Sequence, residues 1–218
     1  MPPAVFVRST QSSRMPLTAL ARRYALFVLS LASGQVMALD AAPTLDQANA
    51  ALHAALSAER AGPQAAASPL GRALLESLKF SLVQGCQSLA PAQTACIVKI
   101  EAPMRDAYQV FAFDLDGADW RLVKRSDIEA PQPTLGGAQA LLREHLQALG
   151  ARETDARRAA EYRRFALALE VAALESCDLD RDSGAVECDA QLHTPGAGAG
   201  SKRVRFQLQG SQWSLLPD

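Results

Sequence analysis

The residues best suited to chemistry are four cysteines, which fall into two closely spaced pairs. Cys86 and Cys96 are ten positions apart, and Cys177 and Cys188 are eleven apart. Such pairs can form disulfides or bind zinc, but zinc sites favour Cys-x-x-Cys spacing, and no histidines cluster with these cysteines. We therefore expect two local disulfides, Cys86–Cys96 and Cys177–Cys188, in a protein of an oxidising compartment.

Two polar residues, Gln84 and Glu175, stand at equivalent inward-facing positions, each two residues before the first cysteine of its pair. A carboxylate buried in a pocket has a raised pKa and can act as an acid or base, so Glu175 is a candidate pocket acid. The favoured alternative is a residue at a strand end that reaches water. Gln84 and Glu175 are the ligand-binding candidates, and no catalytic residue is predicted.

Other residues that can bind metals or act as nucleophiles have simpler explanations. Three alternating aspartates resemble part of an EF-hand loop: Asp178, Asp180 and Asp182. The loop glycine is displaced to Gly184 and no helices flank the run, which favours an acidic turn over a calcium site. The histidines fall on separate predicted elements: His53, His145 and His193. No serine lies in a nucleophile-elbow pattern, and we expect no metal and no cofactor.

The first 38 residues have the features of a signal peptide. Arginines precede an apolar run at residues 24–33 that is too short to span a bilayer, and Val36 and Ala38 offer small residues for cleavage. Both ordinary secretion and twin-arginine export fit Arg22-Arg23. Residues 1–38 carry four arginines and no acidic residue, so their removal changes the formal net charge from −1 to −5. We expect a periplasmic or secreted protein, with no membrane span after signal removal and no nucleic-acid partner.

Two similar stretches, 113–122 and 206–215, indicate that the chain is a tandem duplication. In each, apolar residues at every second position flank a Gly-x pair, which predicts a β-hairpin closed by a type II′ turn. The expected facing pairs are Leu115 with Trp120 and Leu208 with Trp213. Other anchors, the cysteines among them, recur in the same order at offsets of 90 to 93 residues.

Each half begins with residues at helical spacing and continues with alternating strands. The apolar helix positions are Leu45, Ala48, Leu52 and Leu56 in the first half and Leu135, Ala138, Leu142 and Leu146 in the second. A second helical segment is expected at 70–75 and at 155–162. Strand alternation is expected to place Leu82 opposite Ile100 in the first half and to begin at Phe165 in the second.

The sequence therefore predicts an α+β protein of two repeated units. Each unit has one or two helices packed on a four-stranded antiparallel meander with one hairpin disulfide. The expected boundaries are a signal peptide at 1–38, a first repeat at 39–123, a linker at 124–133 and a second repeat at 134–218.

The two repeats differ on the sheet face that points away from the helices. That face is charged in the second half, but in the first it carries apolar residues, chiefly Val83, Ile97, Val110 and Val123. An extended apolar face requires a cover. We expect these four residues to form an interaction face, covered by the second half or by a partner.

A helix followed by a meander that ends in a Phe-x-Leu-x-Gly-x-x-Trp-x-Leu hairpin resembles the small NTF2-like or cystatin-like α+β rolls of exported bacterial proteins. The resemblance would cover residues 44–123 and 134–216. It implies the fold far more than the function, because such rolls include hydrolases, isomerases and noncatalytic binding modules.

The leading interpretation is a noncatalytic exported binding or interaction module that contacts an envelope protein or a small apolar ligand. One alternative is an NTF2-like enzyme that acts on a small apolar substrate. Another is a structural accessory of an envelope assembly. Polar groups that converge in a cavity beneath the helices would favour the enzyme.

Overall fold

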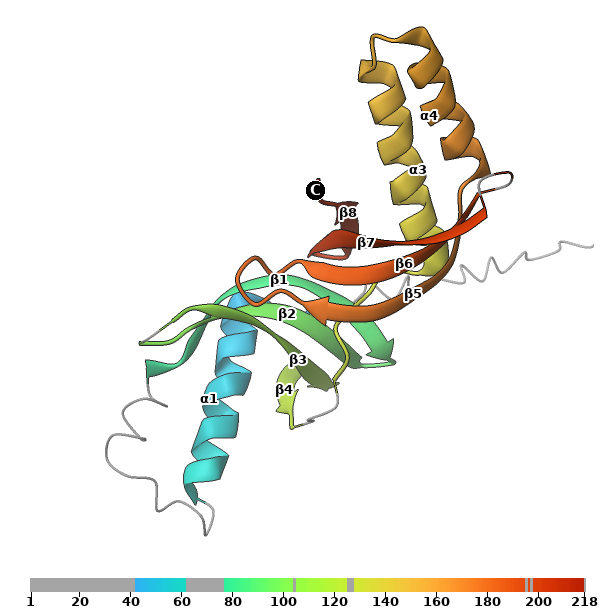
Figure 1. Ribbon diagram of the computed structural model, residues 1–218. Coiled ribbons are helices and arrows are strands. Elements are labelled where there is room, and N and C mark those ends of the chain that lie inside the picture. Colours follow the sequence, from blue (N-terminus) through green and yellow to red (C-terminus); the bar gives the residue numbers. More distant parts are fainter. Residues whose placement is uncertain are drawn as a thin grey trace, which may run out of the picture. The chain divides into compact units, whose positions relative to one another are not determined.

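Two four-stranded antiparallel sheets form the framework of the computed structural model, which describes residues 42–61, 77–103, 105–124, 128–194, 196 and 198–217. Each sheet is a meander whose strands pair in chain order (Figure 1). The first consists of β1 (Lys79–Ala90), β2 (Gln93–Glu101), β3 (Ala107–Asp116) and β4 (Asp119–Val123). The second consists of β5 (Glu170–Leu179), β6 (Val186–Thr194), β7 (Gly198–Gln209) and β8 (Gln212–Leu215). The predicted α+β class is confirmed.

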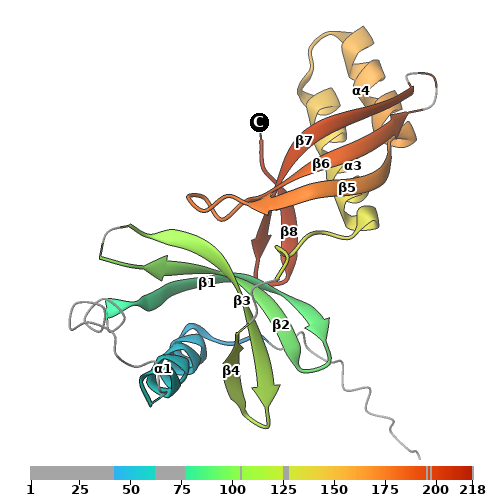
Figure 2. The ribbon, with the colours of Figure 1, turned by 60° about the horizontal axis from the view of Figure 1, so that its bottom comes forward.

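Helices cover one face of each sheet. Helix α1 (Leu45–Ala61) lies against β1 and β4, and α3 (Leu135–Arg152) lies against β5 and β8 (Figure 2). Helix α4 (Ala156–Ala168) packs on α3. None of these described helices is long and apolar enough to cross a membrane. The segment at 70–75 and the signal peptide fall outside the described residues.

Side-chain caps explain where the helices begin. Thr44 and Gln47 form a reciprocal capping box, in which each backbone N–H donates to the other residue's side-chain oxygen (2.9 and 3.2 Å). Thr134 Oγ1 accepts from the Gly137 N–H at the start of α3. Asp155 caps α4 through two backbone N–H groups. The repeated threonines thus start equivalent helices in the two halves.

Both predicted disulfides are present, and each lies within one strand hairpin. Cys86 bonds to Cys96 and Cys177 bonds to Cys188. The final hairpins also have the predicted register, since Leu115 pairs with Trp120 and Leu208 with Trp213. Their turns begin with glycines at positive φ, Gly117 (65°) and Gly210 (61°), as a type II′ turn requires.

The predicted register of β1 is wrong over part of its length. Leu82 pairs with Lys99 instead of Ile100 and its side chain is 43% exposed. Irregularities at 80–82 and 83–85 each insert one residue, so that side chains between them change face. Val83 consequently packs on the core beneath α1 and does not belong to the outer apolar face.

The predicted start of the strand at Phe165 is also wrong, because α4 continues to Ala168. Alternating apolar residues at 165, 167 and 169 fit a strand, but the alanine-rich segment that Asp155 caps contains no helix breaker. Within the helix, Ala166 is buried against its neighbours and Leu167 is 77% exposed. The strand face begins only at Val171, which is buried.

Each half has its own core, and one residue of the first half belongs to the core of the second. Aromatic rings fill the first core, where Phe80 contacts Phe111 and Phe113. Phe206 and Leu208 lie at the centre of the second. Ile97 of β2 is fully buried within this second core. The described residues of both halves belong to one compact unit.

Candidate binding site

The two ligand-binding candidates from the sequence have different surroundings in the structure. Gln84 is buried, and its Nε2 donates to the Gly184 carbonyl oxygen of the second half (2.9 Å). Glu175 is exposed on β5 and its carboxylate accepts from Gln191 Nε2 (3.1 Å). Gln84 therefore joins the two halves, whereas Glu175 belongs to the surface of the second sheet.

Backbone hydrogen bonds make a second joint at the edge of β1. The Cys86 N–H donates to the Gly210 carbonyl oxygen (2.8 Å), and the Gly210 N–H donates to the Gln84 carbonyl oxygen (2.9 Å). The turn between β7 and β8 thereby pairs with Gly85. A Cβ atom at Gly85 would lie 2.6 Å from Leu208 Cγ, so only glycine fits this approach.

The linker forms the third joint. Gln87 Nε2 donates to the Gln132 carbonyl oxygen, and the Gln132 N–H donates to Gln87 Oε1, both at 3.0 Å. Pro131 and Pro133 on either side are buried. Because proline has no N–H, burial leaves no backbone donor unpaired at these two positions.

These joints leave part of the first sheet's outer face uncovered by the described residues. Ile97 is buried in the second core, but Val110 and Val123 are only half-buried. Both line a hollow of about 630 Å³ beside the end of α1. Val110 also lines a larger hollow.

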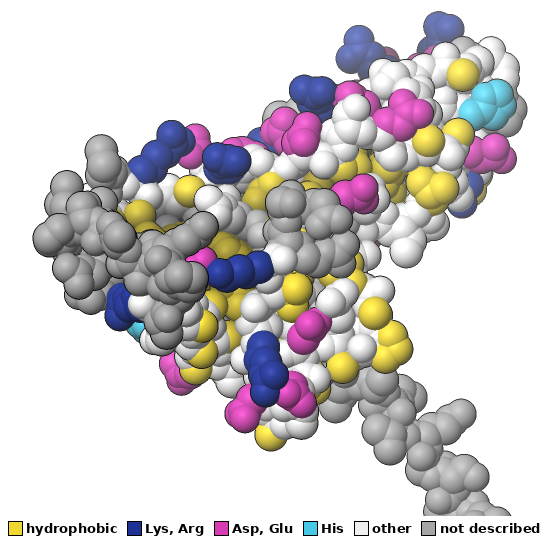
Figure 3. Space-filling model, turned by 90° about the horizontal axis from the view of Figure 1, so that it is seen from below, with side chains coloured by type: hydrophobic (Ala, Val, Ile, Leu, Met, Phe, Trp, Pro, Cys, Tyr) yellow, Lys and Arg dark blue, Asp and Glu magenta, His cyan; other side chains and the backbone are white. Residues whose placement is uncertain are grey.

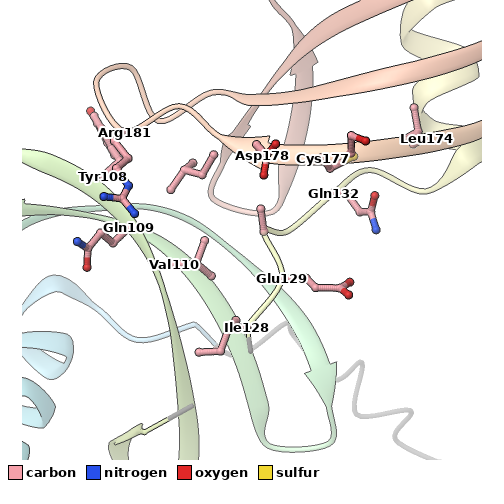
Figure 4. A pocket seen from close by; sticks show the side chains of 13 residues that line it. Tyr108, Gln109, Val110, Ile128, Glu129, Gln132, Leu174, Cys177, Asp178 and Arg181 are labelled. Carbon is pink, nitrogen blue, oxygen red and sulfur yellow. The ribbon is translucent and has the colours of Figure 1, made fainter. Parts of the chain in front are cut away.

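We name this larger space, about 760 Å³, the intersheet hollow. Its walls come from β3, the linker and β5 (Figure 4). Its volume lies within the range of small-molecule sites. Its lining residues are Tyr108, Gln109 and Val110 of β3, Ile128, Glu129, Ala130 and Gln132 of the linker, and Leu174, Ser176, Cys177, Asp178, Leu179 and Arg181 of the second half.

One corner of the intersheet hollow is closed by direct contacts between the halves. The Tyr108 N–H donates to the Arg181 carbonyl oxygen (2.8 Å). Gly184, at φ 71°, has no room for a side chain, because a Cβ atom would lie 2.4 Å from Gln84 Oε1 and 2.7 Å from Tyr108 Cδ1. Arg105 also pairs with Asp182. These contacts fix β3 against the turn that follows β5.

Asp180 and Asp182, in the acidic run at the end of β5, take part in hydrogen bonds within the turn between β5 and β6. Asp180 accepts hydrogen bonds from the Ser183 hydroxyl (2.6 Å) and the Asp182 N–H (2.9 Å). The Ser183 hydrogen bond, followed by that N–H and by the charge of Arg205, lowers the pKa of Asp180. In the described ranges no three His, Cys, Asp or Glu side chains are placed to hold a metal ion.

Charged residues on the sheets pair with their neighbours. Arg203 binds Asp189 through two hydrogen bonds (3.0 and 3.2 Å), which lower the pKa of Asp189. Arg205 Nε lies 3.0 Å from Glu187 Oε1 without hydrogen-bond geometry, so this contact is an ion pair. On the face shown in Figure 3, the acidic and basic side chains of the described residues are interspersed and form no large patch of one sign.

Sequence reasoning missed the residues that shape the intersheet hollow, above all Tyr108 and the linker. It also missed the joint glycines. Gly85 lies inside a strand, where glycine often marks a close backbone approach, and this signal was available. The sequence predicts Gly184 only as a turn residue. Its contact with Gln84 is visible only once the two halves are assembled.

Comparisons of the chain with protein-family models, with curated proteins and with solved structures give no match.

Proposed function

We propose that this protein is a noncatalytic binding or interaction protein of the periplasm or the extracellular space, and that the intersheet hollow is its ligand site. The observation that carries the proposal is the hollow itself, a space of about 760 Å³ between a strand of each half and the linker. The joints around it keep its walls in place without a ligand, which reduces the entropy lost on binding.

The lining of the hollow supports binding over catalysis. Among the described residues that line it, the titratable side chains are Tyr108, Glu129, Asp178 and Arg181, and none is a histidine. A nucleophile or a general base needs a partner within hydrogen-bond reach. The structure gives none of these four side chains a hydrogen bond to another of them, whereas the apolar residues Val110, Ile128 and Leu174 offer contact area.

The smaller hollow beside α1 is where an NTF2-like enzyme would be expected to hold an apolar substrate. Leu52, Leu56 and Phe111 contribute to its lining. Its charged residues are Glu59 and Lys124, which pair with one another (2.5 Å). The two charges neutralise each other, and the described residues that line this hollow include no further titratable side chain that could act as an acid or base. We therefore place the function at the intersheet hollow.

The disulfides support a location in an oxidising compartment. Both cysteine pairs are oxidised, as is typical of exported proteins. Together with the expected signal peptide at 1–38, they favour a periplasmic or secreted protein.

A ligand screen tests the proposal. The oxidised protein is mixed with a library of apolar fragments and short peptides, and ligand-detected NMR identifies those that bind. In spectra of the isotope-labelled protein, we expect the hits to shift the signals of Val110, Ile128 and Leu174, and mass spectrometry should recover the hits chemically unchanged. Conversion of a hit into a product would support the enzyme instead. Hits that map only to other surfaces would refute the assignment of the site.

A further inference from the structure

We propose that the intersheet hollow binds an extended polypeptide segment, which adds as a new strand to the open edge of β5. This inference rests on the proposed function, since it specifies the ligand class of the same site. Strand addition gives affinity through backbone hydrogen bonds and specificity through alternate side chains.

The first step is that β5 has an open edge. It is the outer strand of its sheet, and among the described strands it pairs only with β6. The Asp180 N–H donates to the Ala185 carbonyl oxygen, so the backbone N–H and C=O of Asp180 point toward β6. The backbone groups of Leu179, one residue earlier, therefore point away from β6. The backbone groups of Cys177, two residues before Leu179, also point away from β6. Outside β6, no described residue forms a backbone hydrogen bond with either of them.

The second step is that the hollow adjoins this edge. Ser176, Cys177, Asp178 and Leu179 all line it. Ser176 lies at φ 49° within an irregularity of β5, but from Cys177 to Leu179 the strand is regular. Successive side chains of a regular strand point to opposite faces, so a space that touches these three residues in a row lies at the edge of the strand. Figure 4 shows Cys177 and Asp178 on one side of the space and the β3 residues on the other.

The third step comes from the duplication. Cys177 is the repeat equivalent of Cys86, whose N–H already donates to the Gly210 carbonyl oxygen (2.8 Å). In the first half, this edge position therefore binds the backbone of another segment. In the second half no described segment pairs there, and the position faces the intersheet hollow. Among the described residues, the same backbone site is therefore occupied in the first half and open in the second.

The fourth step is that the opposite wall also has an open edge. The Tyr108 N–H points away from β2, because it donates to the Arg181 carbonyl oxygen. Val110 lies two residues further along β3 and has the same orientation. Pairing between β3 and β4 begins only at Ala112. A segment in the hollow therefore has unpaired strand backbone on both sides.

The side chains of the hollow indicate what kind of segment fits. Val110, Ile128 and Leu174 provide apolar contacts, and the charges of Glu129 and Asp178 exceed that of Arg181 by one. A segment with apolar residues at every second position, and without a cluster of acidic residues, matches this lining.

Peptide selection and N-methylation test the inference. Random peptides displayed on phage are selected against the oxidised protein, and the best binder is synthesised with each amide N-methylated in turn. We expect methylation to weaken binding by about tenfold at every second residue, whose amides face β5, and also at the intervening residue that faces Val110, because each such amide loses one hydrogen bond. Hydrogen exchange at Leu179 and Val110 should slow when the peptide binds.

Variants at Val110 provide the control within the protein. Val110→Pro removes an edge N–H that the described fold does not use, and Val110→Thr keeps it. We expect the proline variant to lose peptide binding and the threonine variant to retain most of it. If the proline variant does not fold, the N-methylation series on the unaltered protein still tests whether the peptide binds as a strand.

The outcomes separate this inference from the proposed function. Peptides that tolerate methylation at every position, or that bind as helices, overturn the inference. So does a selection that yields no peptide although apolar fragments occupy the hollow. In each of these cases the proposed function survives. If neither peptides nor fragments occupy the hollow, both proposals fail.

Discussion

At the scale of single residues, the contact between the halves depends on glycines that leave no room for a side chain. Gly85 is the clearest, because an added Cβ would meet both Leu208 Cγ and the Gly210 carbonyl oxygen (2.8 Å). The second of these is backbone and cannot move without breaking the joint. The contact with the second half therefore requires glycine at position 85, whereas a strand by itself would accept a larger residue there.

Replacing Gly85 tests this constraint. We expect Gly85→Ala to lower the free energy of unfolding by about 1–3 kcal/mol, since the methyl group overpacks a fixed contact. Gly136→Ala is the matched control, because nothing lies within 4 Å of a Cβ at that helix position. Urea denaturation measures both. Equal effects of the two substitutions would show that the close approach at Gly85 has no energetic consequence.

Asp180 gives a prediction about pH. Its lowered pKa in the folded state means that it stabilises the fold above the pKa of the unfolded chain, and that this contribution is lost as the pH falls through the folded value. The wild type should therefore melt at a higher temperature than Asp180→Asn at pH 7, and the difference should shrink below about pH 4. A difference that stays constant down to pH 3 would contradict this role.

At the scale of elements, one hairpin turn contains a residue that does not suit it. The two-residue turn between β1 and β2 consists of Pro91 and Ala92, with Ala92 at φ 64°. A proline followed by a residue at positive φ is the pattern of a type II turn, which favours glycine at the second position.

We expect Ala92→Gly to raise the free energy of unfolding by about 0.5–1 kcal/mol, because relief of the left-handed strain exceeds the added chain entropy. Gly117→Ala provides the reverse substitution at a similar φ (65°), in a turn where a Cβ would meet nothing within 4 Å. It should destabilise the protein by a similar amount. If both substitutions change the free energy of unfolding in the same direction, the φ angle does not determine their effect on stability.

The elements also show how far sequence reasoning extends. Helix starts followed from Thr44 and Thr134, and hairpin registers followed from the Gly-x-x-Trp motifs, because these signals are local. Leu82 and Val83 were placed on the wrong faces, since a bulge shifts alternation by one residue without a sequence mark. The α4 boundary failed because Phe165–Leu169 fits a strand as well as a helix.

The candidate site was much less predictable. The sequence placed Val110 on an apolar face that needs a cover, but the cover itself depends on contacts between residues far apart in the chain. Tyr108 and Arg181, for instance, are joined by a backbone hydrogen bond to which their side chains contribute nothing. Long-range backbone contacts of this kind have no pattern in a single sequence.

At the scale of the whole molecule, Ile97 links the stability of the two halves, because this β2 residue is fully buried in the second core. Its neighbour Val98 is equally buried, but in the first core. The two residues therefore form a matched pair that reports on different halves.

Ile97→Ala should lower stability by about 2–5 kcal/mol and Val98→Ala by less, since fewer methylene groups are removed. The decisive measurement is hydrogen exchange. Ile97→Ala should reduce protection in α3 and β7, whereas Val98→Ala should act mainly on α1 and β1. Loss of protection confined to the first half in both variants would mean that the halves are energetically independent.

The most direct test of the central claim, that the intersheet hollow is the binding site, is to measure ligand affinity and thermal stability together for Val110→Lys. Val110 is half-buried at the hollow, so we expect a small change in melting temperature and at least a tenfold loss of affinity for ligands found in the screen. Gln207→Lys, a half-buried position on β7 outside the hollow, should retain full affinity. Unchanged affinity in the Val110→Lys variant would contradict the claim.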